Sequence, residues 1–123
     1  MPHLILEYSD NIADTIDYKR LLKQINQSLA DTKLFKLNDI KSRAVKHSNY
    51  VIGDGDDSRS FVTINLSIRS GREAAVRKQL SDSLLELLRV NYPKALASQK
   101  VSLTVQISEM DKESYVRITG YDD

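Results

Sequence analysis

Apolar and polar residues alternate in two short segments of the chain, a pattern typical of β-strands with one buried face. The clearest is 61–68, where four aliphatic side chains point one way and the polar residues between them point the other, and the second is 101–107. Two further strands are predicted at 4–8, from its short run of apolar, β-rich residues, and at 40–47. The sequence therefore predicts four strands, each with one face turned toward a core.

Two longer segments have helical spacing instead. The first runs from about Thr15 to Ala30, and Asp14, Thr15 or Asp17 could cap it. The second follows Ser70-Gly71-Arg72-Glu73, whose Ser-x-x-Glu spacing is that of a capping box, and ends at Asn91-Tyr92-Pro93. Each carries an apolar stripe at i, i+3 and i+4: Tyr18, Leu21, Leu22, Ile25 and Leu29 in the first, and Val76, Leu80, Leu84, Leu87 and Leu88 in the second.

The order strand–helix–strand thus occurs twice, over about 2–48 and 60–108, as an internal repeat. We expect one α/β (α+β) domain over 1–123, made of two fused βαβ units with parallel strands within each unit. The two units give a four-stranded sheet with both helices on one face. The uncovered sheet face has mixed polarity, so we expect an oligomer to cover it. A polar tail, 111–123, follows, with a short strand at 115–119.

Composition narrows the function classes. Lys plus Arg is 18 and Asp plus Glu is 17, and this near balance argues against a nucleic-acid partner. The chain has no Cys and two His, so thiol chemistry is excluded and we expect no metal site. Apolar runs are far shorter than the ~20 residues that span a bilayer, and no signal peptide is evident. We therefore expect a cytoplasmic protein without a membrane segment.

Pro2 is the first candidate for chemistry. Removal of Met1 would leave it as a secondary amine held in a ring. An ordinary α-amino group has a pKa of ~7.7–8.0, and nearby cations and an apolar pocket lower that value. Such an amine is suited to general-base catalysis near neutral pH. The alternative is that Pro2 merely starts a strand.

Three cations are candidates for anion binding. Lys41 and Arg43 share one face of the second predicted strand, and Arg72 lies in the first turn of the second predicted helix. A cation near the positive, N-terminal end of the helix dipole is unfavourable by ~0.3–1 kcal/mol. An anion bound at the helix N-terminus would offset this cost. The alternative is that all three are solvated surface charges.

Several short motifs, in this order and spacing, carry a family resemblance. They are Met1-Pro2-His3, Leu6 to Ile12, Ile40-Lys41-Ser42-Arg43 and Ser70-Gly71-Arg72. Together they resemble the 5-carboxymethyl-2-hydroxymuconate isomerase family of the tautomerase superfamily, over roughly residues 2–110.

The resemblance implies a tautomerase-like fold, a homotrimer and a place in the breakdown of aromatic compounds. It also implies a cofactor-free isomerase that converts an unsaturated 2-hydroxy dicarboxylate to its keto isomer. Pro2 would take the hydroxyl proton and return it to carbon. Arg43 and Arg72 would hold substrate carboxylates and stabilise the dienolate. Lys41 stands where the family has an arginine, and it lacks the planar fork that binds carboxylates at two points.

A second interpretation is a non-catalytic module that binds a small anion, or serves assembly, on the same scaffold. Lys41 in place of arginine favours it, and so does Met1. While Met1 remains attached, the nitrogen of Pro2 is an amide and cannot act as a base.

Overall fold

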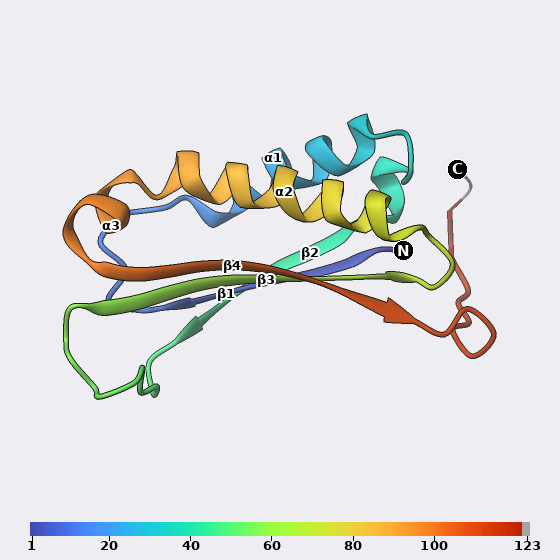
Figure 1. The fold of residues 1–123 in the computed structure, drawn as a ribbon. Coiled ribbons are helices and arrows are strands. Elements are labelled where there is room, and N and C mark those ends of the chain that lie inside the picture. Colours follow the sequence, from blue (N-terminus) through green and yellow to red (C-terminus); the bar gives the residue numbers. More distant parts are fainter. Residues whose placement is uncertain (122–123) are drawn as a thin grey trace.

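The computed structural model describes residues 1–121, and its centre is a four-stranded sheet in the order β2-β1-β3-β4 (Figure 1). The strands are β1 (His3–Ser9), β2 (Lys41–His47), β3 (Arg59–Arg69) and β4 (Lys100–Met110). β1 pairs with β2 and β3 with β4 in parallel, whereas β1 and β3 pair antiparallel. The four predicted strands and the parallel pairing within each half are confirmed, with β3 and β4 longer at both ends than expected.

Two long helices, α1 (Tyr18–Asp31) and α2 (Ala74–Asn91), lie on the same face of the sheet (Figure 1). Their predicted apolar stripes form one core with the inward side chains of the sheet. The buried core includes Leu4, Leu6, Leu21, Ile25, Leu29, Val62, Ile64, Leu66, Ile68, Leu80, Leu84 and Leu88. Among residues 1–121, no helix combines the length and apolar character needed to cross a membrane.

The start of α1 is capped by Asp17, whose carboxylate accepts a hydrogen bond from the backbone N–H of Arg20 at 3.2 Å. The predicted start at Thr15 is wrong by three residues. Asp14 caps a different helix, because its carboxylate accepts from the backbone N–H groups of Lys94 (2.9 Å) and Ala95 (2.8 Å). These residues open the short helix α3 (Pro93–Ser98), which the sequence pattern did not indicate.

The predicted capping box is also wrong. α2 begins at Ala74, and the side chain of Glu73 forms no cap hydrogen bond. Ser70 instead prolongs the sheet, since its backbone N–H donates to the carbonyl of Met110 at 2.9 Å. Gly71, at φ +113°, then turns the chain. Arg72 therefore precedes the helix, and the prediction that it lies in the first helical turn is wrong.

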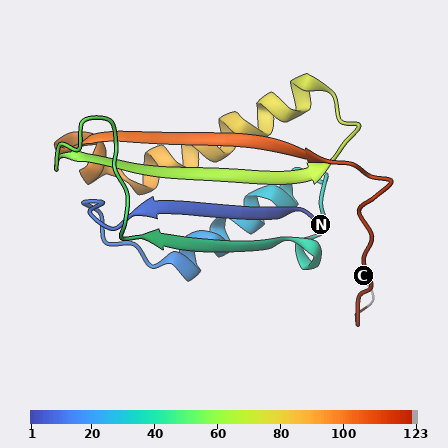
Figure 2. The same ribbon diagram turned by 90° about the horizontal axis from the view of Figure 1, so that it is seen from below.

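The tail beyond β4 forms no strand within its described part, so the strand predicted at 115–119 is wrong. After β4 the chain runs past the end of the sheet at which β1 starts, beside the N-terminus (Figures 1 and 2). It reaches the short 3-10 helix η1 (Leu37–Asp39) through contacts described below. Positions 122 and 123 of the predicted tail lie outside the described residues.

The second face of the sheet is free of helices (Figure 2). Arg43 and Val45 are exposed there, Ile5 and Phe61 are half-buried, and Glu7 faces His47 at 3.5 Å across β1 and β2. The mixed polarity predicted for this face is confirmed for the single chain.

Candidate active site

A pocket of about 320 Å³ lies at the end of the sheet where β1 begins. Four distant parts of the chain form it: the N-terminus, the segment between α1 and β2, the turn after β3, and the tail. Among the described residues, its lining has four cationic side chains and one carboxylate, so it suits a ligand with several negative charges. The lining residues are Met1, Leu34, Phe35, Lys36, Asp39, Arg69, Arg72 and Arg117.

The N-terminus is anchored at this pocket. The amine of Met1 donates a hydrogen bond to the backbone carbonyl of Asp39, and the Nζ of Lys41 donates to the same oxygen at 3.0 Å. The backbone N–H of Lys41 donates to the carbonyl of Pro2 at 3.1 Å, which extends the β1–β2 pairing by one residue. The Pro2 side chain is fully buried. Pro2 is thus fixed beside Lys41, with Met1 between it and the pocket.

The environment of the terminal amine favours its neutral form. Burial lowers the pKa of the Met1 amine from 8.0 to about 6, and the charges of Lys41 and Arg117 also lower it, against an opposing effect of Asp39. Burial and nearby cations are the two effects that we expect to lower the pKa of an amine at this end of the chain. In the unprocessed chain the amine is that of Met1, and the Pro2 nitrogen is an amide.

Arg72 points into the pocket because two contacts hold its guanidinium. Its Nη2 donates to the carbonyl of Leu34 at 3.2 Å, and its Cζ lies 5.0 Å from the centre of the Phe35 ring. Contact with an aromatic face restricts the guanidinium and leaves further N–H groups for an anion. The segment after α1 therefore orients Arg72.

The tail supplies another arginine. The Arg117 guanidinium donates to the two carboxylate oxygens of Asp39 at 2.8 and 3.4 Å. The hydroxyl of Tyr121 donates to that carboxylate at 3.1 Å, and the hydroxyl of Tyr115 is 3.0 Å from Nε2 of His3. Tyr115 also lies 5.7 Å from the Cζ of Arg69. The tail is thus joined to β1, η1 and the end of β3 around the pocket.

The four residues predicted for the site are only partly brought together. Arg72 lines the pocket, whereas Pro2 is buried directly behind Met1, which lines it. Lys41 does not line the pocket but is joined to it through the backbone carbonyl of Asp39. Arg43 is exposed on the open sheet face and does not line the pocket. There its charge acts on His3, whose pKa is lowered first by burial and then by Arg43.

Sequence reasoning missed six residues that line the pocket: Leu34, Phe35, Lys36, Asp39, Arg69 and Arg117. The family motifs contain none of them, although Asp39 and Arg69 each directly precede one. The others lie in the loop after α1 or in the tail, and no local pattern indicates that these segments meet.

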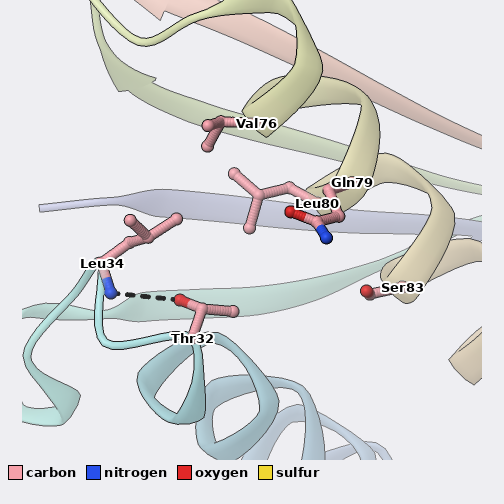
Figure 3. A pocket seen from close by; sticks show the side chains of 6 residues that line it. All are labelled: Thr32, Leu34, Val76, Gln79, Leu80 and Ser83. Carbon is pink, nitrogen blue, oxygen red and sulfur yellow. Dashed lines mark hydrogen bonds between the residues drawn. The ribbon is translucent and has the colours of Figure 1, made fainter.

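A second concave site in the described chain lacks the ionisable side chains that proton transfer needs. A groove of about 390 Å³ lies between the end of α1 and α2 (Figure 3), but its six lining residues include no ionisable side chain. They are Thr32, Leu34, Val76, Gln79, Leu80 and Ser83. Within residues 1–121, no cluster of three or more His, Asp or Glu side chains could hold a metal ion.

Comparisons with known proteins agree with this interpretation of the fold. The family model described as 5-carboxymethyl-2-hydroxymuconate isomerase matches residues 2–119. A curated 5-carboxymethyl-2-hydroxymuconate Delta-isomerase from Escherichia coli is 33% identical over 110 residues, which cover 89% of this chain and 87% of the relative.

Solved structures agree as well. A crystal structure of a 5-carboxymethyl-2-hydroxymuconate isomerase from Deinococcus radiodurans R1 superposes with a TM-score of 0.88 at 30% identity, covering 97% of this chain and 90% of that one. A fused 4-OT protein, described as a symmetric trimer, has a TM-score of 0.74 at 15% identity, covering 97% and 94%, and shares the fold. The chain is therefore an isomerase that belongs to the 5-carboxymethyl-2-hydroxymuconate isomerase family.

Proposed function

We propose that this isomerase converts 5-carboxymethyl-2-hydroxymuconate to its keto isomer, with Pro2 as the general base after loss of Met1. The observation that carries the proposal is the N-terminal amine, partly buried in a cationic pocket, with a pKa lowered to about 6. Removal of Met1 transfers the free amine to Pro2, which stays beside Lys41 and Asp39. The family match beginning at residue 2 supports this start of the working chain.

The reaction needs only a base and cations. Pro2 takes the proton of the 2-hydroxyl group, and the C2–O bond becomes a carbonyl. The C2–C3 double bond shifts to C3–C4, and the electron pair of the C4–C5 double bond accepts the proton that Pro2 returns at C5. The amine is regenerated, and no oxidant or reductant is consumed. An amine with a pKa near or below neutral both accepts and returns the proton readily.

The cations have separate tasks in this proposal. Arg72 binds a substrate carboxylate and stabilises the negative charge that develops on the dienolate. Lys41 keeps the amine neutral, since its ammonium shares the Asp39 carbonyl with the amine. Arg43 lies outside the pocket of the single chain, so its proposed contact with a carboxylate requires the assembled protein.

We propose that the assembly is a homotrimer that covers the open sheet face. On this face of the single chain, Val45 is exposed and Phe61 is half-buried. One protein of the same fold is described as a symmetric trimer. Light scattering should then give three times the chain mass of 14.0 kDa. A monomer with full activity would contradict the trimer and the role of Arg43.

The decisive experiment compares two forms of the protein that differ by one residue. Intact mass identifies the chain with and without Met1, and each is assayed by the ultraviolet absorbance of the dienol substrate. The processed form should be active and the form that keeps Met1 inactive. Processed Pro2→Ala should lose most activity while keeping its fold. Equal activity of the two forms would rule out Pro2 as the base.

The anion-binding module is the second candidate. The Met1 amine at the pocket favours it, since a chain that keeps Met1 has no free Pro2 amine. In that case, calorimetry should detect a tight complex with the substrate while its spectrum stays unchanged over hours.

A further inference from the structure

We propose that Arg117, on the tail, is a substrate-binding residue that selects for a third carboxylate on the substrate. This inference rests on the proposed function and deepens it. It assigns to the tail a role in specificity, beyond the residues of the family motifs.

The charge of the pocket matches such a substrate. Among the described residues, the lining has four cationic side chains, Lys36, Arg69, Arg72 and Arg117, and one carboxylate, that of Asp39. These described side chains give a net charge of about +3 with the amine neutral. 5-Carboxymethyl-2-hydroxymuconate has two carboxylates at the ends of its muconate chain and a third on the carboxymethyl arm at C5. The arm is therefore the part of the substrate that needs a further cation.

Arg117 is positioned for this contact. A guanidinium has five N–H donors, and two of them serve the Asp39 carboxylate at 2.8 and 3.4 Å. The Asp39 side chain is 12% exposed and that of Arg117 is 34% exposed, so one edge of the guanidinium is anchored while another stays accessible. The remaining N–H groups match the planar geometry of a second carboxylate.

Both sides of Arg117 along the tail are held in place. Tyr115 contacts His3 at 3.0 Å, and the hydroxyl of Tyr121 donates to the carbonyl of Asn38 at 3.3 Å and to Asp39 at 3.1 Å. An arginine held before the ligand arrives loses less conformational entropy on binding.

The chemistry places the arm close to Arg117. C5 receives its proton from the base, so the carboxymethyl group on C5 must lie beside the amine. Arg117 is near the amine of Met1, the residue directly before Pro2, since its ion-pair partner Asp39 accepts the hydrogen bond from that amine through its backbone carbonyl. Arg69 lies against the Tyr115 ring, with its Cζ 5.7 Å from the ring centre, whereas Arg117 is held by the carboxylate of Asp39.

Two substrates that differ only in the arm provide the test. Processed wild type, Arg117→Ala, Arg117→Lys and Arg69→Ala are assayed with 5-carboxymethyl-2-hydroxymuconate and with 2-hydroxymuconate, which has the same dienol and two carboxylates. Arg89→Ala, an exposed pair with Glu86 on α2, is the matched control. Because a charge-assisted contact is lost, KM for the three-carboxylate substrate should rise about 10- to 100-fold in Arg117→Ala. KM for 2-hydroxymuconate should stay within about 3-fold, and Arg117→Lys should fall between wild type and Arg117→Ala.

An equal loss on both substrates would overturn the inference, since a purely structural tail would not distinguish them. A selective loss in Arg69→Ala with none in Arg117→Ala would also overturn it. Failure of the proposed function has a separate signature: folded, processed wild type would turn over neither substrate, or Pro2→Ala would retain full activity on both.

Discussion

Arg117 binds the carboxylate of Asp39 through two hydrogen bonds, at 2.8 and 3.4 Å, although 78 positions separate the two residues in the sequence. The same Asp39 offers its backbone carbonyl to the terminal amine and to Lys41. One residue thus connects the tail, the second strand and the N-terminus. Its carboxylate raises the amine pKa while Lys41 and Arg117 lower it, so the amine titrates according to a local balance of charges.

Asp39→Asn should shift this balance toward the neutral amine. The substitution removes the charge that raises the amine pKa and keeps the backbone carbonyl that Lys41 binds, so the pKa of the Met1 amine should fall below about 6. NMR titration of the amine would measure it, and in processed protein the acidic limb of kcat/KM should move to lower pH. Asp82→Asn, an exposed partner of Lys78 on α2, is the control and should change neither. A raised amine pKa in Asp39→Asn would contradict this account.

Lys41→Met should have the opposite effect. Lys41 is the charge with the largest lowering effect on the amine, so its loss should raise the pKa from about 6 toward 8.0. More of the processed amine would then be protonated at pH 7, and activity should fall there and recover at higher pH. Lys41→Arg keeps the charge and should stay close to wild type. If both variants lost activity equally at every pH, Lys41 would act through hydrogen-bond geometry instead of charge.

The amine should also make stability depend on pH. The pKa of the Met1 amine is about 6 in the folded chain, and the unfolded chain has the ordinary value of 8.0. Between pH 6 and pH 8 the unfolded chain therefore binds more protons than the folded chain. The free energy of unfolding of the chain with Met1 should therefore rise from pH 6 to pH 8, and this contribution is lost as pH falls through about 6. Urea unfolding at the two pH values measures it. N-terminally acetylated protein has no titrating amine, and its slope should be smaller; an identical slope would refute the assignment.

Most of the strands and both long helices could be predicted because the patterns that indicate them lie within short stretches of the sequence. The alternation at 61–68 marks a strand whose Val62, Ile64, Leu66 and Ile68 are all buried, and the repeated order of elements indicates parallel pairing within each half. The errors occur where a long-range partner overrides a local signal. Ser70 has the sequence of a cap, yet its N–H pairs with Met110 of β4. Asp14 could cap α1, yet it caps α3, about eighty residues later.

The residues of the candidate site likewise include some that short motifs indicate and others that depend on long-range contacts. Pro2, Lys41 and Arg72 stand in short motifs, so the family resemblance identifies them from the sequence alone. Arg117 and Asp39 could not be found in this way, because their pairing depends on the tail passing the N-terminus. Up to residue 121, the tail has no helix or strand whose backbone hydrogen bonds would fix its path. Three tyrosine and arginine contacts fix it instead, and a side-chain contact of this kind has no periodicity along the sequence.

Gly71→Ala should separate the positioning of Arg72 from global stability. Gly71 adopts φ +113°, where side chains are strained, so alanine should lower the free energy of unfolding by about 1–3 kcal/mol. Relief of this strain would rotate the turn that aims Arg72 at the pocket, and kcat/KM should fall well beyond the change in folded population. Gly55→Ala, at φ +82° in the loop before β3, carries similar strain far from the pocket and is the matched control. Urea unfolding and steady-state kinetics on both variants should show a shared loss of stability and a loss of activity confined to Gly71→Ala. Equal activity of the two variants would mean that the turn at Gly71 does not determine how Arg72 meets the substrate.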